Sequence, residues 1–217
     1  MTFDIDYAIE IIPSLARGAG VTVLAALIGF ALAAAVGLVL ALGRTSSRRW
    51  LRSSTALAVD FIRSTPLLIQ LFVVFYVLPL YGLLFDPFQT GVLVLGLHYS
   101  SYTSEVYRAG IQGVPRGQWE AALALNMTPA QTWRRVIVPQ AIPRVIAPLG
   151  NYLVAIFKET PILATITVGE LLRAALTEAG YTYRFLEPFF LVGLFFLAMS
   201  YPSSLLIRRL ERRFVVR

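Results

Sequence analysis

Five apolar runs, each about as long as a membrane-crossing helix, make up most of this chain. They cover residues 18–42, 57–84, 91–111, 145–168 and 189–207. A helix needs about 20 apolar residues to cross the hydrocarbon core of a bilayer. Because 57% of the residues are hydrophobic and only 14% are charged, the composition also favours a membrane protein over a soluble domain. The sequence therefore predicts a single all-α integral membrane domain, residues 1–217, with five transmembrane helices.

The polar segments between these runs differ in charge. One set is rich in arginine and consists of residues 43–54, 108–144 and 208–217. The other set is acidic and consists of residues 1–17, 86–90 and 170–187. The first set holds fourteen basic and two acidic residues, whereas the second holds three basic and seven acidic residues. Since basic residues near the ends of spans stay in the cytoplasm, we expect the N-terminus outside and the C-terminus inside.

Residue types that the chain lacks argue against several function classes. With no cysteine there is no disulfide and no thiol nucleophile, and a single histidine argues against a metal site. The net charge of +7 comes from arginines at the ends of apolar runs, which indicates membrane topology rather than nucleic-acid binding. A phosphate-binding loop needs glycine directly before its lysine, whereas Lys158, the single lysine, follows Phe157. We therefore expect no enzyme and no cofactor, with any ATP bound by another subunit.

The longest polar stretch, residues 114–143, carries the signals of a helical hairpin. Good helix formers occupy residues 118–125, and Asn126 follows where a left-handed residue would end the helix. Thr128 then offers an N-cap oxygen, and Gln131 completes a Thr-x-x-Gln capping box. The sequence thus predicts two short helices joined by a tight corner.

Prolines and alanines give this hairpin its predicted limits and surface. Pro139 and Pro143 are expected to end the second helix, because proline lacks an N–H and clashes with the preceding turn. Ala121, Ala122 and Ala124 would form a smooth surface of the kind that fits a groove on a partner. Because residues 108–144 belong to the arginine-rich set, the hairpin is expected in the cytoplasm.

The spacing within this stretch resembles a known motif. The residues concerned are Glu120, Ala121, Ala122, Asn126, Val136, Val138 and Pro139. Their series resembles the EAA loop of ATP-binding-cassette importer permeases, E-A-A-x3-G-x9-I-x-L-P, with Asn126 in place of the glycine. In that family the loop docks on the ATPase subunit and transmits its motion. The resemblance assigns this coupling role to Glu120, Ala121, Ala122, Asn126 and Pro139, with an ordinary amphipathic cytoplasmic loop as the alternative.

Further segments are similar to permeases for polar amino acids. They are Arg63–Leu71, Tyr99–Ile111, Pro115–Glu120 and Leu210–Arg213. Within that family, residues 98–100, Asn126 and residues 150–158 look most like permease subunits for ectoine and hydroxyectoine. The resemblance implies a bacterial inner-membrane protein that imports polar amino acids or solutes derived from them.

The same resemblance implies the partners. They are a separate ATPase subunit, an extracytoplasmic solute-binding protein, and a second permease subunit that is either a homologue or another copy of this chain. Five spans enclose too little for a pathway, which also favours a pair. A secondary transporter driven by an ion gradient, or a transporter accessory subunit, stays open as the alternative, although five spans without an inverted repeat are few for that design.

Two adjacent charges lie within the fourth apolar run. Lys158 and Glu159 are expensive to place inside a membrane, and such charges usually serve a function. Pro161 should break the helix there and leave the carbonyl of Phe157 unpaired, as in the interrupted helices with which transporters bind polar solutes. We therefore place Lys158 and Glu159 on the substrate path. The alternative is an ion pair that only holds helices in register.

A polar face follows the third apolar run. His98, Ser101, Tyr102 and Glu105 recur at helical spacing, so they share one face of the helix. Such a face avoids lipid and lines either a cavity or a contact between helices. His98, Tyr102 and Glu105 are therefore candidates for the substrate path.

Three other polar residues complete the candidates within the spans. Asn151 lies in the fourth run and is a plausible polar contact to a neighbouring helix, so it joins the substrate-path candidates. Asp60 and Arg63, three residues apart near the cytoplasmic boundary, are expected to form a structural or gating pair.

Overall fold

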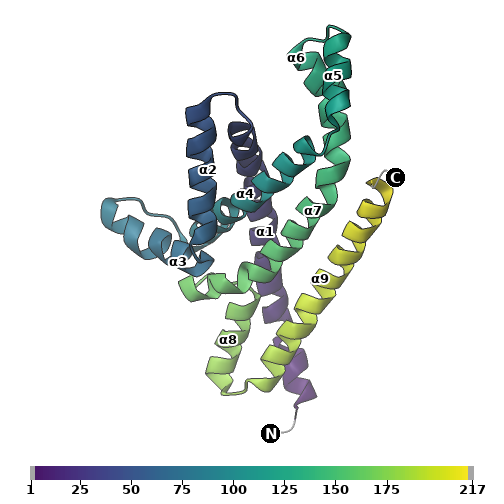
Figure 1. Cartoon of the computed structure of the whole chain (residues 1–217). Helices are drawn as coiled ribbons and strands as arrows, with labels where there is room; N and C mark the ends of the chain where they lie inside the picture. Colours follow the sequence, from purple (N-terminus) through teal and green to yellow (C-terminus); the bar gives the residue numbers. More distant parts are fainter. Residues whose placement is uncertain (1–2, 215–217) are drawn as a thin grey trace.

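The computed structural model describes residues 3–214, and these are helical with no strand among them (Figure 1). The α-helices are α1 (Ile5–Arg44), α2 (Arg49–Ser64), α3 (Leu67–Phe72), α4 (Pro87–Gln112), α5 (Arg116–Ala124), α6 (Pro129–Thr132), α7 (Val138–Glu159), α8 (Leu171–Thr182) and α9 (Leu186–Phe214). Turns of π-helix cover Val73–Val77 and Trp133–Ile137. Turns of 3-10 helix cover Leu78–Tyr81 and Thr160–Ile166. The predicted all-α fold is confirmed.

The core of the fold is the contact between α1 and α4. Small residues let the two backbones approach closely, and Thr103 Oγ1 of α4 donates a hydrogen bond of 2.7 Å to the carbonyl of Ala33 in α1. A Cβ atom on Gly37 would lie 2.9 Å from the carbonyl oxygen of Ser100 and closer still to Thr103 Oγ1. Only glycine fits there.

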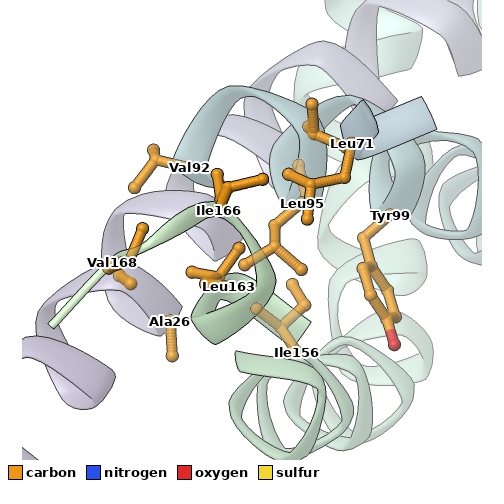
Figure 2. Packing of buried hydrophobic residues seen from close by; sticks show 12 residues of the cluster. Ala26, Leu71, Val92, Leu95, Tyr99, Ile156, Leu163, Ile166 and Val168 are labelled. Carbon is orange, nitrogen blue, oxygen red and sulfur yellow. The ribbon is translucent and has the colours of Figure 1, made fainter. Parts of the chain in front are cut away.

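Larger apolar side chains fill the space between this pair and α7. Figure 2 shows Leu95 of α4, Leu71 of α3, Ile156 of α7 and Leu163 of the following turn pointing toward one another. These four side chains are at most 1% exposed. The burial of apolar side chains from three distant stretches of sequence fixes α7 against the α1–α4 pair.

The first predicted span is longer than expected. α1 begins at Ile5 instead of residue 18, because Asp4 caps its N-terminus by accepting a hydrogen bond from the Tyr7 N–H. The acidic segment before residue 18 is therefore part of the same helix. Pro13 lies inside α1 without ending it.

The second predicted span, residues 57–84, is not one helix. The stretch Arg49–Ser64 and the stretch Leu67–Tyr81 meet at an angle of 100°. Thr65 takes an extended conformation because it precedes Pro66, which disfavours the helical region. Gln70 Nε2 then holds the bend by donating 2.7 Å and 2.6 Å hydrogen bonds to the Ile62 carbonyl and to Thr65 Oγ1.

The expectation that Pro139 and Pro143 end the second helix of the hairpin is wrong. α6, the π turn Trp133–Ile137 and α7 follow one another without a break from Pro129 to Glu159. The π turn closes with a hydrogen bond from the Val138 N–H to the Trp133 carbonyl, and the Gln140 side chain supplies a 3.0 Å hydrogen bond to the Val136 carbonyl beside Pro139. Proline removes one backbone hydrogen bond, and the burial of Ile137 and Ala141 on either side of Pro139 outweighs that loss.

The predicted break near Pro161 is confirmed, but the Phe157 carbonyl is not left unpaired, because Thr160 Oγ1 donates a 2.8 Å hydrogen bond to it. α7 ends at Glu159, a 3-10 turn continues from Thr160 to Ile166, and Thr167 is left-handed with φ 67°. The segment 170–187, expected as a loop, contains α8. Its N-cap is the buried Glu170, whose carboxylate accepts from the N–H groups of Leu172 and Arg173.

Two helices are long and apolar enough to cross a membrane, namely α1 and the Leu186–Leu210 part of α9. Two bent pairs, Arg49–Ser64 with Leu67–Tyr81 and Pro129–Ile166 with Leu171–Thr182, raise the number to four if each is one span. α4, the predicted third span, is absent from these helices of the described chain because its polar face lowers its hydropathy. The count of five spans and the orientation stay predictions.

Candidate functional site

α5 and α6 form the predicted hairpin at the end of the molecule opposite the N-terminus (Figure 1). Asn126 has φ 53° and is left-handed, as predicted. The Met127 N–H donates to the Ala122 carbonyl at 3.1 Å, and the Asn126 N–H donates to the Leu123 carbonyl at 2.9 Å. This pair of hydrogen bonds is the Schellman motif that ends helices.

The start of α6 is fixed by the predicted capping box. The Thr128 N–H donates to Gln131 Oε1 at 2.9 Å, and the Gln131 N–H donates to Thr128 Oγ1 at 3.4 Å. Pro129 takes the first helical position. The corner is thus held by backbone and side-chain hydrogen bonds on both sides.

The exposed surface of the hairpin differs from the expected alanine surface. Ala122 is only 2% exposed, so it faces the interior of the hairpin and is not available for docking. Ala121 and Glu120 are exposed, and the side chains of Leu123 and Leu125 are each 76% exposed. Two leucines with this much exposure, on a polar hairpin, mark a surface that is suited to contact with a partner.

An apolar cluster and one polar contact join the hairpin to α7. The rings of Trp119 and Trp133 meet edge to face with centroids 5.6 Å apart, beside the buried Ile137. Gln140 Nε2 donates to Gln118 Oε1 at 3.0 Å. Pro139, predicted to take part in coupling, is exposed at the start of α7 next to this contact.

Glu105 lies at the centre of an arginine cluster rather than open to a cavity. Its carboxylate accepts from Arg44 at the end of α1 and from Arg108 Nε at 2.8 Å. Arg63 Nη1 of α2 lies 3.6 Å from Glu105 Oε1. Three helices therefore meet at one carboxylate. The predicted Asp60–Arg63 pair is wrong, because Arg63 turns to α4 while Asp60 is exposed.

An aromatic wall of α4 and α7 lies next to the arginine cluster. It consists of His98, Tyr99, Tyr102 and Tyr152, with neighbouring ring centroids 5.4 to 6.1 Å apart. His98 Nδ1 lies 3.2 Å from Gln70 Oε1, so the buried histidine is hydrogen-bonded to the α2–α3 bend. Tyr99 and Tyr152 were not predicted as site residues; Tyr99 directly follows His98, and Tyr152 directly follows Asn151.

The charged residues of α7 are exposed on the chain. Lys158, Glu159 and Asn151 all lie on the surface, although they belong to a predicted span. Among the side chains that the structure describes, those of residues 3–210 and 212, no oppositely charged group lies within 4 Å of Lys158 or Glu159, so the two do not pair with each other. Lys158 lines a groove of about 410 Å³ with Pro161 of the 3-10 turn and Phe196 of α9. Charges inside a membrane need a protein partner or water, which the isolated chain does not supply.

The described residues contain no group of three or more His, Asp or Glu side chains that could hold a metal ion. Glu105 is surrounded by arginines, and His98 is bonded to a glutamine. The polar groups of the site are therefore suited to hydrogen bonding and charge recognition.

Comparisons with known proteins place this geometry in context. Residues 33–216 match the family described as "Binding-protein-dependent transport system inner membrane component". A probable amino-acid ABC transporter permease of Sinorhizobium fredii, y4tG, is 47% identical over 94% of this chain and 89% of its own length. The L-cystine transport system permease TcyB of Bacillus subtilis is 36% identical over 92% of this chain and 88% of its own length. The glutamine transport system permease GlnP of Escherichia coli is 32% identical over 98% of both chains.

Solved structures agree with these relatives. A crystal structure of an amino acid ABC transporter with histidines matches 98% of this chain and 100% of the solved chain, with a TM-score of 0.92 and 34% identity. The methionine ABC transporter MetNI, in an inward-facing conformation, has a TM-score of 0.74 at 19% identity and supports the fold alone.

Proposed function

Because the chain belongs to the family of inner-membrane components of binding-protein-dependent transport systems, we propose that it forms the solute path of an ATP-driven importer and couples this path to a separate ATPase. The observation that carries the proposal is the continuous helical stretch from Pro129 to Glu159. One end of it holds the hairpin, and the other holds Lys158 and Glu159.

The hairpin is the proposed ATPase contact. Leu123 and Leu125 expose apolar area, and the Schellman motif at Asn126 with the capping box at Thr128 fixes how that area is presented. A preorganised surface loses less freedom on binding than a flexible loop does. Thirty-one residues of helix at 1.5 Å per residue span about 46 Å, so a rigid-body tilt at the hairpin reaches the far side of the bilayer core.

The exposed charges on α7 support a second permease subunit. Lys158, Glu159 and Asn151 cannot face lipid, so a partner chain or a water-filled path between two chains has to cover them. The partner is a homologue or another copy of this chain, and a solute-binding protein delivers solute from outside.

The chemistry of the site supports a polar amino acid or a solute derived from one. Lys158 offers a cation for a carboxylate and Glu159 an anion for an ammonium group, while the partly buried ring of Tyr152 is suited to a cationic nitrogen. Relatives named for cystine and glutamine transport support this class. Ectoine and hydroxyectoine, suggested by the sequence resemblance, gain no support from these relatives and stay one choice within the class.

Reconstitution of the complex in liposomes tests the proposal. The chain is purified with its ATPase and binding protein, and uptake of glutamine, cystine, histidine and ectoine is measured with and without ATP. We expect uptake that needs ATP and the binding protein, for one solute of this class. Uptake driven by an ion gradient without ATP would instead support the alternative, a secondary transporter.

A further inference from the structure

One polar contact crosses from α5 to α7, between Gln118 and Gln140. Gln140 Nε2 donates hydrogen bonds of 3.0 Å both to Gln118 Oε1 and to the backbone carbonyl of Val136. A glutamine amide has two N–H donors, so Gln140 uses both of them here. Among residues 3–214 this is the sole side-chain hydrogen bond between α5 and the stretch Trp133–Glu159.

The helix at this point is built in a way that permits bending. The π turn Trp133–Ile137 lies directly before Pro139, which has no N–H to donate. Proline and π turns are the places where helices bend. The Gln140 side chain contacts the carbonyl of Val136 inside the π turn and a side chain of α5 at once, so it ties the angle of the hairpin to the conformation of the turn.

The other contacts between α5 and this stretch are apolar. Trp119 and Trp133 touch edge to face, and Val114, Ile137 and Ala141 form a small buried cluster. These contacts hold the hairpin near α7 through packing, to which the glutamine pair adds a polar contact. A hydrogen bond depends strongly on distance and angle, so it can select one orientation.

We propose that Gln118 and Gln140 are positioning residues for coupling: they hold the hairpin at one angle to α7, so that movement of a docked ATPase turns α7 instead of being lost at the π turn. The inference rests on the proposed docking function of the hairpin. It assigns to both glutamines a role in transmission, separate from the contact surface of Leu123 and Leu125.

Uptake per ATP hydrolysed, measured in the reconstituted complex, tests the role directly. The variants are Gln118→Ala, Gln140→Ala and the double variant. Gln89→Ala is the control, because Gln89 is exposed near the N-terminal end of α4, whereas the hairpin follows the C-terminal end of α4. We expect each single variant to lower uptake per ATP by about two- to tenfold, the range that one hydrogen bond spans. The double variant should be no worse than the more damaging single variant, since one contact is lost in all three.

Replacing the two glutamines by an oppositely charged pair tests whether the contact itself matters. In Gln118→Glu with Gln140→Lys, the lysine ammonium can donate to both the glutamate and the Val136 carbonyl, and we expect uptake per ATP to recover to at least half of the wild-type value. Gln140→Lys alone should stay impaired. Recovery is not expected if the glutamines only fill space.

Three results would contradict the positioning role of Gln118 and Gln140: unchanged uptake per ATP, additive losses in the double variant, or losses that only follow the amount of assembled complex. Failure of the wild-type chain to bind the ATPase in a pull-down would contradict the proposed function instead, so the two failures are distinguishable.

Discussion

The guanidinium group of Arg63 lies 5.0 Å above the ring of Tyr102, so the end of α2 contacts the aromatic wall of α4. The same arginine lies 3.6 Å from Glu105. Because Glu105 also forms ion pairs with Arg44 and Arg108, the negative charge of its carboxylate stays compensated without Arg63. Arg63 therefore serves mainly to hold the α2–α3 bend against α4.

Replacing Arg63 should destabilise this bend. We expect Arg63→Ala to lose about 0.5–1 kcal/mol, the range for a partly exposed cation–π contact, and to lower the melting temperature of the purified complex by about 1–4 °C. Arg49→Ala on the same helix is the control, because Arg49 is exposed and makes no ion pair with any other side chain that the structure describes. Equal shifts for the two variants would contradict a specific contact.

The corner at Asn126 predicts opposite results for two substitutions. Asn126→Gly should retain transport because glycine adopts φ 53° without strain, whereas Asn126→Val should lose it because a β-branched residue resists positive φ. The strain is about 1–3 kcal/mol. Uptake by membranes with equal amounts of each variant measures the difference, and equal activity of both would refute the corner's role.

Neighbouring alanines should respond differently to a charge. Ala121→Glu adds a carboxylate to the exposed surface and should weaken ATPase binding at least tenfold while the hairpin stays folded. Ala122→Glu buries a carboxylate and should unfold the hairpin itself, since Ala122 is 2% exposed. A pull-down of the ATPase reports binding, and limited proteolysis reports folding. Protease resistance of Ala122→Glu equal to the wild type would contradict the difference.

Neutralising both charges of α7 separates a binding role from a structural one. If Lys158 and Glu159 bind solute, the double variant Lys158→Met with Glu159→Gln should assemble normally and lose at least tenfold in uptake. If they only form ion pairs with a partner subunit, the double variant leaves the partner's charges unpaired and should lower the amount of assembled complex rather than uptake per complex. Uptake is normalised to complex in the membrane, and wild-type uptake would exclude the binding role.

The contact between Asp4 and Arg184 predicts sensitivity to acid. Arg184 Nη1 donates to Asp4 Oδ2 at 2.6 Å and, with the Tyr7 N–H, lowers the pKa of Asp4 below its ordinary value. Folding therefore favours the charged carboxylate, and its contribution is full above the ordinary aspartate pKa of about 3.9 and is lost as pH falls through the lowered value. Thermal unfolding below about pH 4 should be less pH-dependent in Asp4→Asn, with Asp6→Asn as the control. An equal pH dependence in Asp4→Asn and the wild type would contradict it.

Features that depend on a few adjacent residues were predicted from the sequence. The left-handed Asn126, the capping box at Thr128 and the break before Pro161 all follow from local backbone chemistry, and the structure confirms them. These features need no knowledge of distant partners.

Features that depend on distant partners were not predicted. Arg63 was expected to pair with Asp60 three residues away, but the available partner is Glu105 on another helix. The helical stretch continues through Pro139 because Ile137 and Ala141 are buried in one cluster with Val114, which outweighs the hydrogen bond that proline removes. The role of Glu105 also changes, because two of its arginines come from α1 and α2. Sequence spacing alone does not reveal such contacts.

The close approach at Gly37 has a consequence for how the protein changes shape. With Ser100 and Thr103 pressed against the α1 backbone, α1 and α4 cannot slide along each other by one residue without a collision. We therefore expect these two helices to behave as a stationary frame throughout the transport cycle. Alternating access then requires movement elsewhere in the chain. We expect it in the segment that follows Pro66 and in the helical stretch that starts at the Trp133–Ile137 turn.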